Sequence, residues 1–175
     1  MKMEMKQQHS MREVILDKVT VNICVGNDKQ AMNKAEKLIK LVTNKTPVYA
    51  TAKRRLATWQ LRPGVPIGYK VTLRGNDAKE FLGWVLKSKN NTVSKSSLDE
   101  TGNFSLGVPE YLDLPGMKYD AEIGIMGFEL MATFTRPGFR IKNRRLRKSK
   151  IPKRHKVTQE EVMEFMKENF GAEVK

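Results

Sequence analysis

Residues 16–25 read LDKVTVNICV and alternate in polarity along their length. The apolar residues that share one side of this segment are Val19, Val21, Ile23 and Val25. The opposite side carries Lys18, Thr20, Asn22 and Cys24. A period of two residues is typical of a strand buried on one side only. The segment therefore predicts a sheet with one face packed against other elements and one polar face.

The segments that follow supply further strands and the helices to cover them. A helix after a cap at Asn27 or Asp28 would carry the apolar stripe Ala31, Ala35, Leu38 and Val42. Residues 67–74, IGYKVTLR, alternate again and place Lys70, Thr72 and Arg74 on the polar side. We expect Asp77 and Glu80 to cap a second helix, which runs to about Lys87, and Thr158 with Glu161 to cap a last one.

Shorter apolar stretches at 48–52 and 104–108 predict two more strands, and 123–127 with 130–135 predict two strands or one bent strand. The expected fold class is α+β, an antiparallel-rich mixed sheet with helices packed on one face. We expect all 175 residues to form a single domain. Its appendages would be a polar N-terminal extension (1–10), an extended basic loop (53–68), a basic tract (140–156) and a C-terminal helix (158–170).

Charge is strongly segregated along the chain, whose formal net charge is +14. Residues 37–76 hold nine lysines and arginines and no acid, and residues 130–159 hold eleven and no acid. Such a field favours a polyanionic partner, with nucleic acid ahead of an anionic membrane surface. A membrane-binding helix needs bulky apolar residues opposite its cations. The tract 140–156 has only Ile141, Leu146 and Ile151, so we expect no membrane partner.

Enzymatic signatures are weak. The two histidines, His9 and His155, have no spaced metal partners, and Cys24 has no histidine nearby in the sequence. No glycine-rich phosphate loop followed by Lys-Ser/Thr is present. We expect no catalytic residue, metal or cofactor. The lone cysteine and the polar N-terminus, which lacks an apolar signal region, indicate a cytoplasmic protein.

The basic stretches fit RNA better than the alternatives do. Residues 53–74, KRRLATWQLRPGVPIGYKVTLR, place Arg54, Arg55 and Arg62 around Trp59. Cations neutralise phosphates, and aromatic or guanidinium planes stack on unpaired bases. The structural alternative makes Trp59 an anchor folded onto the domain. The alternative for residues 140–156 is a solubilising charge run, although ten of its seventeen residues are cationic. Without a polyanion, we expect this tract to be disordered.

Several strings in order resemble one known family. They are VTVNICVG (19–26), TPVYATAKRR (46–55), YKVTLRG (69–75), ETGNFSLGVPEY (100–111) and TRPGFRI (135–141). They are similar to segments of the large-subunit ribosomal protein five family, the universal five, which is called eleven in eukaryotes. The basic tract followed by VTQEEVMEFMKENFG resembles the archaeal and eukaryotic branch.

The resemblance implies a non-enzymatic ribosomal protein that binds 5S ribosomal RNA and attaches it to the large subunit in the central protuberance. It also implies contact with large-subunit ribosomal RNA and other central-protuberance proteins. A basic loop would approach the peptidyl-site transfer RNA, and a small-subunit head protein, the universal thirteen, would meet this chain in an intersubunit bridge. An RNA-processing or RNA-modifying enzyme and an extra-ribosomal regulatory binding protein are the alternatives.

Carried over by position, the resemblance assigns residues to three RNA contacts. The 5S ribosomal RNA contact would use Asn22, Lys45, Thr46, Thr72 and Arg74. The loop that faces transfer RNA would use Lys53, Arg54, Arg55, Trp59 and Arg62. The basic tract would contact RNA through Arg136, Arg140, Arg144, Arg145, Arg147 and Lys148.

One segment departs from the family pattern. The family commonly reads Thr-Gly-Gln-x-Pro where this chain has Thr43-Asn44-Lys45-Thr46-Pro47. Asn44 can adopt the left-handed conformation that glycine would supply. Lys45 brings a point charge in place of an amide, so we expect a phosphate contact there rather than a specific hydrogen bond.

Overall fold

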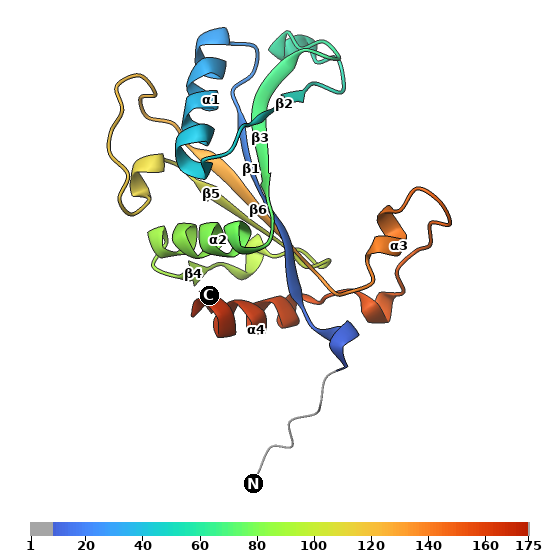
Figure 1. The fold of residues 1–175 in the computed structure, drawn as a ribbon. Helices are drawn as coiled ribbons and strands as arrows, with labels where there is room; N and C mark the ends of the chain where they lie inside the picture. The colour runs from blue at the N-terminus through green and yellow to red at the C-terminus, as the bar shows by residue number, and fades with distance from the viewer. Residues whose placement is uncertain (1–8, 175) are drawn as a thin grey trace.

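A five-stranded sheet forms the centre of the molecule in the computed structural model, which describes residues 9–174 (Figure 1). The strand order is β2-β3-β1-β6-β5, and every neighbouring pair is antiparallel. The strands are β1 (Ile15–Cys24), β2 (Val48–Thr51), β3 (Pro66–Leu73), β5 (Asn103–Val108) and β6 (Phe128–Thr135). The only parallel pairing in the described residues joins β4 (Thr92–Val93) to β7 (Glu173–Val174) in a separate pair. The α+β class is confirmed. Most of the expected N-terminal extension lies outside the described residues.

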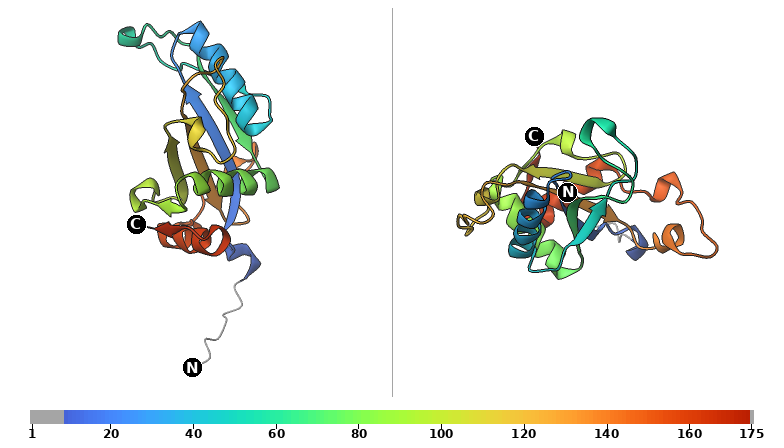
Figure 2. Two further views of the ribbon diagram at one scale, coloured as in Figure 1. Left: turned by 90° about the vertical axis from the view of Figure 1, so that its left-hand side faces the viewer. Right: turned by 90° about the horizontal axis from the view of Figure 1, so that it is seen from above.

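The main helices pack on one face of the sheet (Figures 1 and 2). They are α1 (Lys29–Thr43), α2 (Asn76–Ser88) and α4 (Gln159–Phe170). Leu73 of β3 points toward this face and lines a groove with residues of both α1 and α2. Phe165 of α4 packs edge-on against the buried Phe134 of β6, with ring centroids 5.4 Å apart. No helix among the described residues covers the opposite face of the sheet, which is called the open face below (Figures 1 and 2).

Burial along β1 follows the alternation that its sequence predicts. Val19, Val21 and Ile23 are buried, whereas Thr20 and Asn22 are only partly covered. The pairing with β6 contains a bulge between Leu16 and Lys18. An extra residue in one strand shifts the alternation, so Leu16 is buried although it lies three residues before Val19.

Several helix ends are as expected. Asp28 caps α1, and its side chain accepts a hydrogen bond of 2.9 Å from the backbone N–H of Gln30. Thr158 and Glu161 form the capping box of α4, and Gly171 ends that helix in the left-handed conformation. The expected cap of α2 is wrong: Gly75 occupies the position and the helix begins at Asn76, which places Asp77 in the first turn.

The strand expected at 123–127 is also wrong, because β6 begins only at Phe128. The backbone N–H groups of Ile123 and Gly124 donate to the carbonyl of Asp120, which folds the chain into a turn. A positive φ of 72° at Gly124 fits this turn and does not fit a strand.

Gly68 allows two neighbouring strands, β1 and β3, to approach closely. It lies opposite Cys24 in the pairing of β3 with β1. A Cβ atom at this position would lie 2.1 Å from the carbonyl oxygen of Ile23. Only glycine can occupy this position unless the strands move apart.

Candidate nucleic-acid interface

Polar side chains from neighbouring strands form rows across the open face. Asn22 of β1 lies directly opposite Lys70 of β3 on one side and Glu129 of β6 on the other. The next row places Thr20 opposite Thr72. The Nδ2 atom of Asn22 donates to Oε2 of Glu129 over 3.3 Å. Two of the residues expected at 5S ribosomal RNA, Asn22 and Thr72, therefore share this face.

Arg74 follows the end of β3 and is held by an acid. Its Nη1 atom lies 2.8 Å from Oδ1 of Asp17, and the Arg74 side chain is 61% exposed. Exposed ion pairs are weak, because water and salt screen both charges. A phosphate group can therefore replace Asp17 as the partner of this guanidinium at a small cost in free energy.

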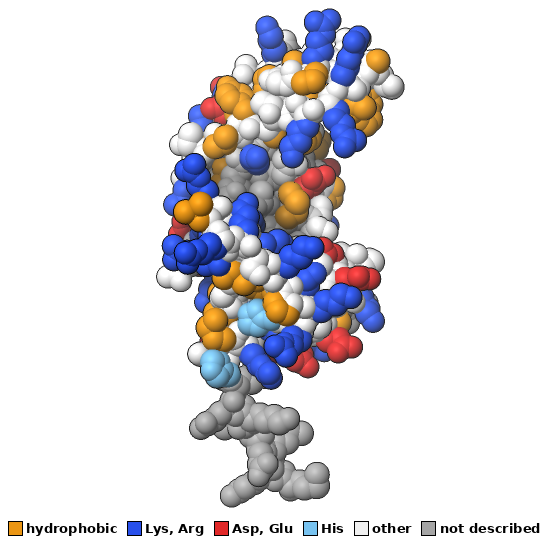
Figure 3. Space-filling view, turned by 90° about the vertical axis from the view of Figure 1, so that its right-hand side faces the viewer, with side chains coloured by type: hydrophobic (Ala, Val, Ile, Leu, Met, Phe, Trp, Pro, Cys, Tyr) orange, Lys and Arg blue, Asp and Glu red, His pale blue; other side chains and the backbone are white. Residues whose placement is uncertain are grey.

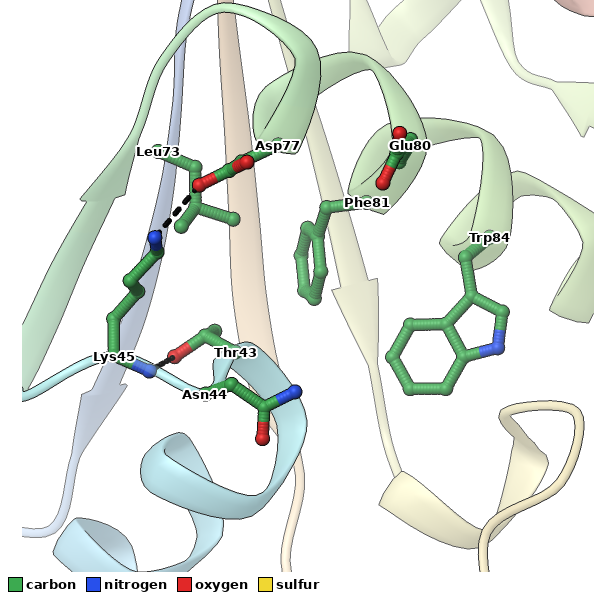
Figure 4. A pocket seen from close by; sticks show the side chains of 8 residues that line it. All are labelled: Thr43, Asn44, Lys45, Leu73, Asp77, Glu80, Phe81 and Trp84. Carbon is green, nitrogen blue, oxygen red and sulfur yellow. Dashed lines mark hydrogen bonds and ion pairs between the residues drawn. The ribbon is translucent and has the colours of Figure 1, made fainter.

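Lys45 and Thr46 leave α1 at a different place, beside the helices. Nζ of Lys45 lies 2.8 Å from Oδ2 of Asp77 (Figure 4). The hydrogen bond from Lys45, with its positive charge, lowers the pKa of Asp77. Asn44 adopts the left-handed conformation with φ of 51°, as its sequence position predicts. Thr46 is exposed just before β2.

An open groove of about 380 Å³ lies between the end of α1 and α2 (Figure 4). Its lining comprises Thr43, Asn44, Lys45, Leu73, Asp77, Glu80, Phe81 and Trp84. The two carboxylates make this groove unfavourable for phosphate. Lys45 is thus separated from the row that contains Asn22, and the five residues expected at 5S ribosomal RNA do not form one cluster.

The loop between β2 and β3 is an ordered extension of that hairpin. Leu56 and Leu61 exchange backbone hydrogen bonds of 3.1 and 3.0 Å. The loop covers residues 52–65, since β3 begins at Pro66 rather than after residue 68. Its exposed cations are Lys53, Arg54, Arg55 and Arg62. Trp59 is 67% exposed, so the alternative that it anchors the loop on the domain is wrong.

The basic tract forms a second projection from the domain. Its charge pattern predicts disorder, but the tract contains local hydrogen-bonded structure. It begins with one helical turn, α3 (Arg140–Asn143), and the N–H of Ser149 returns to the carbonyl of Ile141. Nε of Arg144 donates to the carbonyl of Arg147 over 2.8 Å. Five of the six residues expected to bind RNA at the basic tract are exposed, namely Arg140, Arg144, Arg145, Arg147 and Lys148. Figure 3 shows cations gathered at the top of this side of the molecule, near the β2–β3 loop, and across its middle.

Arg136 has a different environment from the other arginines assigned to RNA. The residue is 8% exposed, its Nη2 atom pairs with Oε1 of Glu161, and its Nη1 atom donates to the carbonyl of Arg154. The guanidinium therefore joins the end of β6 to the start of α4. This geometry gives Arg136 a structural role within the protein, and its contact with RNA stays a prediction.

Replacing Arg136 with methionine should lower the free energy of unfolding by about 2 kcal/mol. Removing one partner of a fully buried ion pair costs about 3–5 kcal/mol, and the side chain of Glu161 is 35% exposed, which reduces the loss. Urea unfolding measures the change. The control is Arg140→Met, which removes an exposed guanidinium. Equal unfolding midpoints for the two variants would contradict the structural role.

The described part of the chain has neither a metal-binding cluster nor a membrane-spanning helix. Among residues 9–174, no three His, Cys, Asp or Glu side chains are grouped so that they could hold a metal ion. No helix in the same range is long and apolar enough to cross a membrane. Cys24 is exposed on the open face, beside Asn22.

Comparison with known proteins identifies the family. A family model described as "Ribosomal protein L5" matches residues 9–62, and the model of the C-terminal region of the same ribosomal family matches residues 66–165. A protein of Sulfurisphaera tokodaii named "Large ribosomal subunit protein uL5" is 46% identical over 98% of this chain and 97% of its own length. Proteins of the same name from Sulfolobus acidocaldarius and Nanoarchaeum equitans are 44% and 41% identical, over 98% and 95% of this chain and 96% and 99% of their own lengths. The chain therefore belongs to the ribosomal protein L5 family, as a member of archaeal type.

Proposed function

We propose that this protein binds 5S ribosomal RNA through the open face of its five-stranded sheet. The L5 family is structural and non-enzymatic, and its members are bound to the ribosome in the cytoplasm. This protein has the corresponding role in the large ribosomal subunit. The family thus removes the RNA-processing or RNA-modifying enzyme from the alternatives.

The observation that carries the proposal is a broad and largely polar face that no helix of residues 9–174 covers. Its rows contain amide, hydroxyl and ammonium groups, represented by Asn22, Thr20, Thr72 and Lys70. Such groups reach the sugar and base edges of unpaired nucleotides, whereas a surface of lysines and arginines alone would contact phosphates. The face therefore suits a specific RNA, and the surrounding cations add affinity.

The two projections extend this proposal to other parts of the ribosome. The β2–β3 loop, with its cations and exposed Trp59, would approach the peptidyl-site transfer RNA. The basic tract would contact large-subunit ribosomal RNA as the protein attaches 5S ribosomal RNA in the central protuberance. The small-subunit head protein of the intersubunit bridge and neighbouring central-protuberance proteins complete the proposed partners.

The test removes two side chains of the face. Asn22→Ala combined with Thr72→Ala should weaken binding to 5S ribosomal RNA by about tenfold or more, because each lost hydrogen bond contributes about 0.5–1.5 kcal/mol. Affinity for an unrelated structured RNA of similar length should change less than about twofold, because the phosphate-binding cations are retained. Both affinities are measured across a salt series.

Two exposed amides on α1 provide the control pair, Gln30→Ala with Asn33→Ala. This pair should leave both affinities unchanged. If binding depended on charge alone, the affinity for each RNA would fall by about 0.7–0.9 log units per decade of salt for each phosphate neutralised. The fall would be equal for the two RNAs. If the preference for 5S ribosomal RNA disappears at high salt in the unchanged protein, the proposed specific contact is refuted.

A further inference from the structure

Within the described residues, a single carboxylate stands in the row of the open face that contains Asn22. Glu129 is exposed on β6 and lies directly opposite Asn22. The other acid near this face, Asp17, lies close to its end and is paired with Arg74. An uncompensated negative charge opposes the approach of phosphate groups. A carboxylate on a surface proposed to bind RNA therefore needs a role other than phosphate binding.

The neighbours of Glu129 fix its position and leave its charge available. Nδ2 of Asn22 donates to Oε2 over 3.3 Å, which orients the carboxylate. No lysine or arginine of the described residues forms an ion pair with Glu129. Lys70 lies on the other side of Asn22 in the same row. The row thus runs from a donor, Lys70, through an amide to an acceptor.

Guanine is the base whose edge complements such a row. Its Watson–Crick edge presents two adjacent donors, N1–H and the N2 amino group, followed by the O6 acceptor. Adenine, cytosine and uracil each place an acceptor beside their donor, and a carboxylate would repel that acceptor. Neighbouring strands lie about 4.8 Å apart, so two spacings, about 10 Å, separate the backbones of Lys70 and Glu129, and the long lysine side chain can reach back across a base edge toward the carboxylate.

We infer that Glu129, oriented by Asn22, recognises the Watson–Crick edge of an unpaired guanine in the bound RNA. The carboxylate accepts from N1–H and the N2 amino group, and Lys70 reaches O6. Specific recognition of RNA takes place largely at unstacked bases that are read on this edge. The inference rests on the proposed function, since it assumes that the open face binds 5S ribosomal RNA.

The sign of one substitution tests the inference. Glu129→Gln removes a negative charge, so charge alone predicts tighter binding to any RNA. Recognition of guanine predicts the opposite for 5S ribosomal RNA, about a tenfold loss, because hydrogen bonds to a charged acceptor are the stronger kind. The control, Glu164→Gln, makes the same charge change at an exposed position on α4 and should not weaken binding. Equal or tighter binding of 5S ribosomal RNA by Glu129→Gln overturns the inference.

A second measurement identifies the base. A set of 5S ribosomal RNAs is prepared in which one loop guanosine at a time is replaced by inosine, which lacks the N2 amino group. One replacement should weaken binding about fivefold or more to the unchanged protein and less than about twofold to Glu129→Gln. If no position shows this difference, guanine recognition by Glu129 is overturned. Loss of binding in Asn22→Ala with Thr72→Ala, but not in Glu129→Gln, would refute this inference alone; unchanged binding in both would refute the proposed function as well.

Discussion

Large subunits that carry Arg54→Glu together with Arg55→Glu should bind peptidyl-site transfer RNA at least about tenfold more weakly, while the isolated protein binds 5S ribosomal RNA within about threefold of normal. Both arginines are exposed on the β2–β3 loop, which projects beyond the sheet (Figure 1). Reversing both charges removes phosphate contacts and adds repulsion at the same place. Exposed charges separated by more than about 10 Å are largely screened at 0.1 M salt, so the open face should feel little change.

The matched control reverses two charges on α2, Lys79→Glu with Lys87→Glu, which are also exposed. It changes the net charge equally and should leave transfer RNA binding intact. Filter binding on reconstituted subunits and on the isolated protein supplies the two affinities. Equal losses in the two assays for the loop variant would show that the loop belongs to the 5S ribosomal RNA contact instead.

Gly68→Ala should lower the free energy of unfolding by about 3 kcal/mol or more. Its Cβ atom would lie 2.1 Å from the carbonyl oxygen of Ile23 and 2.9 Å from Cα of Cys24. These are backbone atoms, which cannot turn aside as a flexible side chain can. Overpacking usually costs about 1–3 kcal/mol, and here relief requires β1 and β3 to separate within the sheet. Urea unfolding followed by circular dichroism measures the loss.

Gly107→Ala is the control, because a Cβ atom at Gly107 on β5 would meet no atom within 4 Å. Alanine also restricts the unfolded chain more than glycine does, so this variant should be as stable as the unchanged protein or slightly more so. A similar loss of stability in both variants would contradict the prediction. It would mean that the close approach of β1 and β3 is not what makes glycine necessary at residue 68.

Local patterns predict most of the secondary structure. The alternation in LDKVTVNICV identifies a half-buried strand, and the capping residues Asp28 and Thr158 locate two helix starts. Such a pattern misplaces the start of α2. Asp77 has a side chain suited to a helix cap, but Gly75 occupies the cap position because of its backbone conformation. Apolar content alone suggests a strand at 123–127, where hydrogen bonds to Asp120 make a turn.

The candidate site is predictable only in part, since its contacts join residues far apart in the sequence. Exposed cations in the loop and the tract follow from composition. The burial of Arg136 depends on Glu161, twenty-five residues away, and no local pattern reveals that pair. Glu129 belongs to an acid-rich stretch of the sequence, and only the register of β1 with β6 brings it to Asn22.

The position of α4 in the core has a consequence for folding during synthesis. Val162 and Met166 are fully buried in the cluster that includes Val19 and Leu130. All five strands of the sheet emerge from the translating ribosome before α4 does. Until α4 has been synthesised, the nascent chain exposes part of its apolar core. Two highly cationic segments lie in the same chain and can bind the RNA that surrounds the translating ribosome. The protein therefore completes its core only late in its own synthesis, and the exposed intermediate is the state that most needs protection from aggregation.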